Sequence, residues 1–336
     1  MNVSSWKECV LNSPKRFAVP IMTHPGIEMI GKTIIEAVSD GEVQFQAIKA
    51  IHDKYSPDAV SMIMDLTVES EAFGAKINLS KHEIPTVVER LVADRESIEA
   101  LEIPSVESAR VPQFLNAIRL TVDCINTIPV FAGCIGPFSL AGRLFGLTEI
   151  MTSIFIEPEI IKSLLEKCTT FINSYIREMK RIGADGVLMA EPAAGLLSPE
   201  ICDEFSSAYV KAIANEIQDN DFLLLLHNCG NTGHVTQSMV STGAGGLHFG
   251  NRVNLAETLK QIPENVLVFG NLDPVSVFRS GTPEIVFDAT TNLLRQTSGH
   301  RNFIVSSGCD TPPNSPIENV EAFFNAVRTF DSKAQL

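Results

Sequence analysis

Eight short apolar runs, separated by segments long enough to hold a helix, set the strongest limit on the fold of this chain. Alternation of strand-like and helix-like segments is typical of βα units that build a parallel sheet. Eight parallel strands are the number that closes into a (β/α)8 barrel, so we expect an α/β protein of the TIM-barrel type. The runs are residues 17–23, 59–65, 128–134, 186–191, 222–227, 246–249, 266–271 and 303–307.

The segments between the runs support this expectation. Residues 160–182 place apolar side chains on one helical face, and Ser198-Pro199 and Ser315-Pro316 have the form of helix starts. Residues 66–127 are too many for one crossover, so we expect a helical excursion over the barrel mouth between the second and third strands. Because the 336 residues are 45% hydrophobic and show no linker or repeat, we expect a single domain over residues 1–336.

Charge and composition argue against several classes of protein. A formal net charge of −14 disfavours a nucleic-acid partner. No stretch approaches the roughly 18 apolar residues of a membrane span, and the first residues lack the basic and apolar regions of a secretion signal. An odd number of cysteines, seven, then indicates reduced thiols, and we expect a cytoplasmic protein that binds no membrane.

Polar residues follow the apolar runs, at the strand ends where barrel enzymes carry their active sites. Asp65 ends a mostly apolar run and is a candidate catalytic residue. Glu191 is a second candidate, either as a metal ligand or as an acceptor behind one, although a carboxylate before Pro192 is also a helix cap in many proteins. Further polar residues at these ends, which serve the site or merely line the rim, are His24, His248 and Asp273.

His227 and Cys229 form the most informative pair in the chain. Side chains two apart in a strand share a face, so both can chelate one ion. Cys309 follows another strand, and if the two strands neighbour each other it supplies a third ligand. One imidazole and two thiolates would leave a tetrahedral zinc ion one open position, as in catalytic sites. The alternative is that each is a buried structural residue, which is how we interpret the other five cysteines.

Several motifs together resemble the uroporphyrinogen decarboxylase superfamily, and within it the zinc-dependent methylcobamide:coenzyme M methyltransferases. The resemblance extends over nearly the whole chain. Its zinc motif, His-x-Cys with a distant Cys, matches His227, Cys229 and Cys309. The other matching segments are residues 57–60, 64–69, 72–74, 133–138, 183–186, 191–192, 198–199, 227–230, 271–274 and 307–309.

The resemblance implies a methyltransferase that moves a methyl group from a corrinoid, carried as methylcobamide on a separate protein, to a small thiol such as coenzyme M. It also implies Zn²⁺ as the cofactor. Zinc would lower the pKa of the thiol, and the resulting thiolate would attack the methyl group on cobalt. A decarboxylase is disfavoured, because residues 22–26 lack the arginines with which that enzyme binds its polycarboxylate substrate.

Other interpretations remain open. The acceptor could be another thiol or tetrahydrofolate. The chain could also be a tetrapyrrole enzyme of the decarboxylase type, or a barrel that binds a corrinoid protein or zinc without catalysis. The sequence does not separate the possible acceptors.

Overall fold

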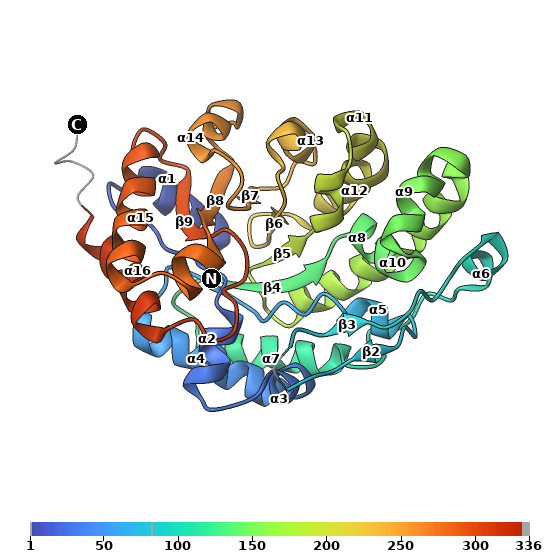
Figure 1. The fold of residues 1–336 in the computed structure, drawn as a ribbon, viewed down its shortest axis with the longest axis horizontal. Coiled ribbons are helices and arrows are strands. Elements are labelled where there is room, and N and C mark those ends of the chain that lie inside the picture. Colours follow the sequence, from blue (N-terminus) through green and yellow to red (C-terminus); the bar gives the residue numbers. More distant parts are fainter. Residues whose placement is uncertain (1, 82, 331–336) are drawn as a thin grey trace.

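The computed structural model describes residues 2–81 and 83–330, which form an α/β fold around a curled parallel sheet. Helices surround the outside of the sheet (Figure 1). Within the described residues the sheet has seven strands in the order β1-β4-β5-β6-β7-β8-β9. These strands are β1 (Val60–Ser61), β4 (Val130–Ile135), β5 (Gly186–Ala190), β6 (Leu223–Asn228), β7 (Gly246–Phe249), β8 (Leu267–Leu272) and β9 (Phe303–Ser307).

The helices occupy the segments that the sequence analysis assigned to crossovers, and 3-10 and π turns extend several of them. Among the described residues, no single helix is long and apolar enough to cross a bilayer; α8 and α9 meet that criterion only together, as a pair bent by 104°. The helices are α1 (Val3–Asn12), α2 (Thr23–Met29), α3 (Ile34–Ser39), α4 (Gly41–Tyr55), α5 (Val68–Ala72), α6 (Arg95–Ala100), α7 (Val111–Cys124), α8 (Pro137–Phe145), α9 (Leu147–Ile156), α10 (Pro158–Arg181), α11 (Pro199–Cys202), α12 (Ala208–Ile217), α13 (Thr236–Ser241), α14 (Leu255–Thr258), α15 (Pro283–Gln296) and α16 (Ile317–Thr329), with the turns η1 (Pro192–Leu196), η2 (Asp203–Ser207), η3 (Gly233–Val235), η4 (Leu259–Gln261) and η5 (Pro274–Arg279).

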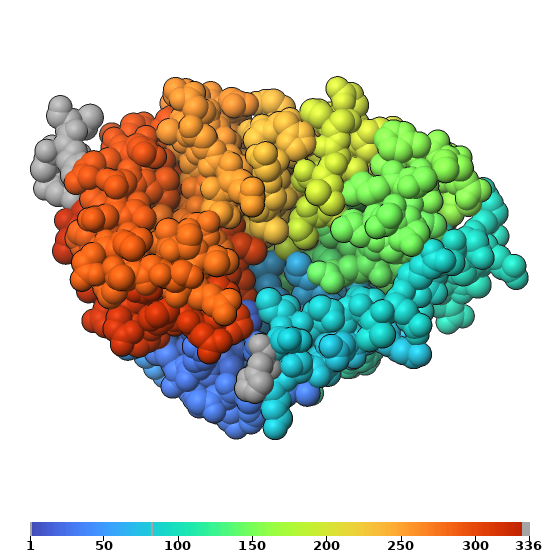
Figure 2. Space-filling view, viewed as in Figure 1, coloured from blue at the N-terminus to red at the C-terminus, as the bar shows by residue number. Residues whose placement is uncertain are grey.

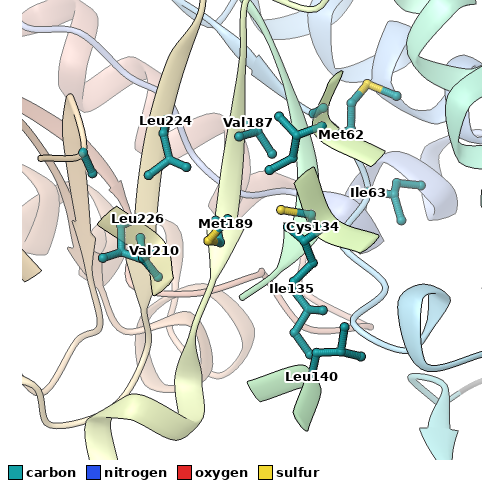
Figure 3. Packing of buried hydrophobic residues seen from close by; sticks show 14 of the residues in the cluster. Met62, Ile63, Cys134, Ile135, Leu140, Val187, Met189, Val210, Leu224 and Leu226 are labelled. Carbon is teal, nitrogen blue, oxygen red and sulfur yellow. The ribbon is translucent and has the colours of Figure 1, made fainter. Parts of the chain in front are cut away.

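Side chains along each strand alternate between two buried layers, as the pleat requires. In β6, Leu224 and Leu226 pack toward the helices, beside outward residues of β5 such as Met189 (Figure 3). Leu223 and Leu225 point the other way and pack with residues of β4, β5, β8 and β9 in a second cluster. Because strands that are not neighbours share this second cluster, it is the interior of the curled sheet.

Helix α1 covers one end of that interior. Its buried residues Val3, Trp6 and Val10 belong to the interior cluster, and the Trp6 ring meets the Phe131 ring edge-on at 5.8 Å. Trp6 also donates a hydrogen bond from Nε1 to the carbonyl oxygen of Asp58 at 3.1 Å. The sequence analysis did not predict this helix. It closes the end of the sheet opposite the C-terminal ends of the strands.

The run at residues 17–23 was expected to be a full strand, and this prediction was wrong. Only Ala18 pairs with β9, as an isolated parallel bridge to Val305, and helix α2 already begins at Thr23. Pro20 has no N–H with which to continue a ladder. The next amide, that of Ile21, instead donates to the hydroxyl of Ser307 at 3.1 Å.

Two further expectations need correction. The second run forms only the two-residue strand β1, and β6 and β9 are not neighbours, since β7 and β8 lie between them. The curl of the sheet, rather than adjacency, therefore brings their ends together. The segment at residues 66–127 contains α5, α6 and α7, but also an antiparallel pair, β2 (Ile77–Asn78) and β3 (Thr86–Val87), which the sequence analysis did not predict.

The predicted helix and the predicted helix starts agree better with the structure. Ser198 caps α11 by accepting a hydrogen bond from the amide of Ile201, and the helix predicted over residues 160–182 is α10. Helix α16 begins after Ser315-Pro316 as expected, although Ser315 bonds to the carbonyl of Pro312 instead of capping it. Gly243 adopts a φ of 73° in the turn between α13 and β7, a conformation that favours glycine.

Trp6→Ala should destabilise the protein by about 3 kcal/mol, since the change removes a large buried side chain and leaves a cavity at the end of the interior. Urea unfolding followed by far-UV circular dichroism measures this, because Trp6 is the only tryptophan and fluorescence would be lost. The control is Glu8→Ala in the same helix, where the side chain is exposed and a change within about 0.5 kcal/mol is expected. Equal effects of the two substitutions would contradict the covering role of α1.

Candidate metal centre

The structure brings His227, Cys229 and Cys309 together. One potential ligand atom from each residue lies within 4.8 Å of the other two. His227 continues the inward-facing series of Leu223 and Leu225 in β6, which is why the alternation of the strand directs it to the interior. Cys229 follows the end of the same strand. Cys309 lies in the turn after β9, across the curled sheet from them.

A chain of buried polar side chains orients His227. Its Nδ1 lies 2.8 Å from Nδ1 of His248 on β7, and Nε2 of His248 lies 3.0 Å from the hydroxyl of Ser306 on β9. Burial, with a contribution from the charge of His227, holds the pKa of His248 well below its ordinary value, so His248 is neutral. Since Nδ1 of His227 is engaged, its Nε2 is the nitrogen left to bind a metal.

The two thiols affect each other strongly. A hydrogen bond from Cys309, followed by the influence of His227, lowers the pKa of the Cys229 thiol to about 4. The same hydrogen bond, together with burial and the charge on Cys229, raises the pKa of Cys309 above its ordinary value. Without a cation the site thus holds one thiolate and one thiol. A divalent cation would stabilise both as thiolates.

These three residues line a cavity of about 150 Å³. Its wall is mostly apolar and comes from several distant parts of the chain, including Ile21, Ile34, Ile63 and the segment around Ile84. In the space-filling view, the surface is hollowed where the cyan segment that contains β2 and β3 meets the red C-terminal part (Figure 2). The cavity is of a size for a small molecule, and its wall excludes water from most directions.

Asp65 borders the same cavity, but both of its carboxylate oxygens are engaged. Oδ1 accepts hydrogen bonds from the amide and the hydroxyl of Thr67, at 2.9 and 2.6 Å. Oδ2 forms a buried ion pair with Arg110, which also pairs with Glu71. Asp65 therefore holds Arg110 in place rather than presenting a free carboxylate to a ligand.

Glu191 lies outside the ligand cluster and does not line the cavity. Glu191 directly follows β5, and the alternation along that strand directs it to the same side as Val187 and Met189, which face the helices. Its Oε1 accepts hydrogen bonds from the amide of Ser139 at 3.1 Å and from the hydroxyl of Ser206 at 3.2 Å. The amide of Ser139 is one of the unpaired donors in the first turn of α8, so Glu191 caps that helix from a neighbouring strand. It does not cap the η1 turn that follows it.

Glu69 is a second carboxyl group buried behind the sheet. Its Oε1 accepts a hydrogen bond from the amide of Ile135 at 2.9 Å, and burial raises its pKa to about 7. Burial likewise raises the pKa of Glu191 to about 8. In each group Oε2 has no hydrogen-bond partner within the described part of the chain, which fits a neutral carboxylic acid.

The other polar residues at the strand ends divide into two groups. His24 lines the cavity and donates from Nδ1 to the carbonyl oxygen of Thr311 at 2.9 Å, with Asp310 at 3.5 Å from the same nitrogen. Asp273 instead caps the η5 turn by accepting hydrogen bonds from the amides of Val275 and Ser276. Arg143, from α8, also lines the cavity. The sequence analysis missed Arg143, because it belongs to no motif and follows Gly136 by two helical turns.

Comparison with known proteins places the chain in a family. The model of the uroporphyrinogen decarboxylase (URO-D) family matches residues 13–330. The chain belongs to this family. Within it, the chain is 30% identical over 299 residues to the methylcobamide:CoM methyltransferase MtbA of Methanosarcina acetivorans, covering 88% of this chain and 86% of that protein. It is 26% identical to the uroporphyrinogen decarboxylase of Coxiella burnetii, covering 83% of this chain and 79% of the relative.

Solved structures support the fold of this family member. A methyltransferase from Methanosarcina mazei superposes with a TM-score of 0.88 at 22% identity, covering 98% of both chains. A B12-independent methionine synthase from Shewanella superposes with a TM-score of 0.59 at 15% identity, covering 95% of this chain and 96% of the other. The likeness is thus in the whole α/β architecture rather than in one segment.

The raised pKa of Glu69 predicts a pH dependence of stability. Between its ordinary value near 4.5 and about 7 the unfolded chain releases this proton while the folded protein retains it, so stability falls as pH rises through that window. Glu69→Gln removes the titration, and the decline should shrink by at most about 3 kcal/mol. Urea unfolding at pH 5 and pH 8 measures the difference.

The control for this prediction is Glu89→Gln, which changes an exposed carboxylate that pairs with Lys76. It should leave the decline as it is in the wild type. Some decline will persist in Glu69→Gln because Glu191 still titrates. A decline identical in Glu69→Gln and the wild type would show that Glu69 is ionised in the folded protein.

Proposed function

We propose that this protein is a methyltransferase that moves a methyl group from a protein-bound methylcobamide to a small thiol such as coenzyme M, with Zn²⁺ held by His227, Cys229 and Cys309. The observation that carries the proposal is the meeting of these three ligand atoms within 4.8 Å in a cavity of the sheet interior. The 30% identity to a methylcobamide:CoM methyltransferase over most of both chains supports the same assignment.

The residues present fit a zinc ion. Imidazole nitrogen and thiolate sulfur are the ligands that zinc prefers, and two thiolates balance its charge. Three protein ligands leave a position for a substrate thiol. When bound, the metal would lower the pKa of that thiol while the two cysteinates keep its sulfur electron-rich.

The protein's own residues supply orientation and a dry environment. His248 and Ser306 fix the ring of His227, and the apolar wall of the cavity keeps water from the thiolate. In the transfer, a lone pair of the thiolate sulfur forms the new C–S bond while the Co–C bond breaks. Both electrons of the broken bond remain on cobalt as Co(I), and the thiol proton goes to solvent.

In this proposal, Asp65 and Glu191 do not touch the substrate; each positions another part of the protein. Asp65, in the wall of the cavity, fixes Arg110 behind it, and Glu191 stabilises the first turn of α8. We also propose that the chain is one (β/α)8 barrel domain, in which the bridging segment around Ala18 takes the place of the first strand. The amide of Val19 donates to Val305 at 3.1 Å and the amide of Val305 donates to Phe17 at 3.0 Å, which supports this interpretation.

The residues that line the cavity suit a small thiol, because the metal-ligand candidates would meet its sulfur and the apolar wall would meet its carbon chain. A decarboxylase of the same family is disfavoured by the residues at the start of α2. Residues 22–26 contain His24 but no arginine, and therefore lack the cations that a polycarboxylate substrate needs.

The methyl donor requires a docking surface beside the cavity. A groove next to it shares Arg143 and Pro192 with the cavity wall. Exposed apolar side chains of this groove are Val88 at 61%, Leu147 at 45% and Leu196 at 66%. We propose that the corrinoid protein docks here, since a groove continuous with the thiol cavity lets the methyl group reach the sulfur.

Cys309→Ala should lower kcat/KM for methyl transfer from methylcobalamin to thiols by at least about 100-fold and reduce zinc content, because loss of a ligand weakens the metal site more than loss of a group behind it. Decay of the methyl-cobalt absorbance with a panel of thiols measures turnover, and a chelator should abolish it in the wild type. Cys124→Ala, at an exposed cysteine, is the control. Turnover that survives removal of the metal would contradict the proposed mechanism.

Leu196→Asp should raise KM for a methylated corrinoid protein by about tenfold, since it places a charge in the proposed docking groove. Turnover with free methylcobalamin should change little. Ile285→Asp, at a similarly exposed apolar residue of α15, is the control and should alter neither rate. A loss of equal size with free methylcobalamin would show that Leu196 acts on the active site and not on docking.

A further inference from the structure

Arg143 is a cation in the wall of the metal cavity for which the structure shows no partner. The residue is only partly exposed, and burial lowers the pKa of its guanidinium. Within the described part of the chain, it makes no hydrogen bond or ion pair. A partly buried guanidinium without an acceptor is costly, so this arrangement points to an anion that enters the cavity.

The neighbouring carboxyl groups do not meet this need. Asp65 is already engaged by Arg110 and Thr67. Burial raises the pKa of Glu69 to about 7, and its Oε1 accepts a hydrogen bond from the amide of Ile135. Asp65, and Glu69 when it is ionised, lie close enough to favour the protonated guanidinium, yet neither forms an ion pair with it. Arg143 is therefore charged and free to bind a ligand.

The wall of the cavity carries two kinds of polar group. One is the set of metal-ligand candidates His227, Cys229 and Cys309, and the other is the guanidinium of Arg143. Apolar residues make up most of the remaining wall, among them Ile27, Val38 and Ile63. A molecule that satisfies all three features has a thiol, a short aliphatic linker and an anionic group. A volume of about 150 Å³ is appropriate for such a compound.

We propose that Arg143 binds the anionic group of the substrate thiol and thereby selects anionic over neutral thiols. The proposal rests on the proposed function, in which the thiol is the methyl acceptor. The planar guanidinium can donate two parallel hydrogen bonds to an oxyanion, whether sulfonate, carboxylate or phosphate. Contact at both ends also fixes the direction of the sulfur, which a single contact at the metal does not.

The position of Arg143 suits this task. It lies in the last turn of α8, and helical side chains lean toward the helix N-terminus, which here is the end adjoining β4 and the cavity. Pro137 at the first helical position and the capping carboxyl of Glu191 stabilise that end. The guanidinium is thus held by a rigid, buried helix rather than by a loop.

The test compares matched thiols in the zinc-loaded protein: 2-mercaptoethanesulfonate, 3-mercaptopropionate and the neutral 2-mercaptoethanol, each with free methylcobalamin. We expect Arg143→Met to lower kcat/KM for the anionic thiols by about 10- to 100-fold, mainly through KM, and to leave 2-mercaptoethanol within about twofold. Arg143→Lys should restore part of the difference, because it keeps the charge but not the paired hydrogen bonds. Arg119→Met, at an exposed arginine of α7, should have no effect.

A second readout needs no turnover. Ethanesulfonate, which carries the anion but no thiol, should bind the zinc-loaded wild type in calorimetry and fail to bind Arg143→Met. Zinc content and melting temperature of the variant show that it is folded. Unchanged anion binding, an equal loss for anionic and neutral thiols, or a rise in KM for methylcobalamin alone would each overturn the proposal. Anion binding by Arg143 in a protein that methylates no thiol would instead contradict the proposed function and leave the anion site standing.

Discussion

The candidate site depends on one line of buried hydrogen bonds, from His227 through His248 to Ser306. It connects β6, β7 and β9, and so ties the strand that carries two of the proposed ligands to the strand that precedes the third. Each partner is buried, so a break in the line would leave a polar group without a partner in an apolar interior. The same contacts determine which nitrogen of His227 faces the cavity. The same hydrogen bonds therefore determine which atom of His227 can bind a metal, where that atom lies, and how the curled sheet holds β6 near β9.

Much of this arrangement could be predicted from the sequence, because the strand period is short and regular. The alternation in β6 places His227 in the interior, and seven of the eight apolar runs contain strands of the sheet. The same alternation, applied to β5, would have directed Glu191 toward the helices, but the residue was interpreted by its place at the strand end. For Glu191, the alternation of side chains along the strand predicts the direction of the side chain better than its place at the strand end does.

What could not be predicted depends on contacts between distant segments. Nothing near Cys309 in the sequence shows that two other strands separate it from Cys229, because the curl of a sheet results from the packing of all its strands. By sequence, Arg143 is an ordinary helix residue and Arg110 an ordinary residue before a helix. Their importance comes from the groups they face in the folded chain. The helix α1 likewise has no local signal for the surface that it covers.

Helix α1, which covers the end of the sheet opposite the C-terminal ends of the strands, has a consequence for the order in which reactants bind. With Val3, Trp6 and Val10 packed into the interior, α1 covers that end of the sheet, while the cavity lies at the C-terminal ends of the strands. A large donor seated on the rim would obstruct a mercaptan that comes second, and would trap a thioether that tries to leave first. For a donor docked in the proposed groove, the expected order is therefore acceptor in, donor on, donor off, product out.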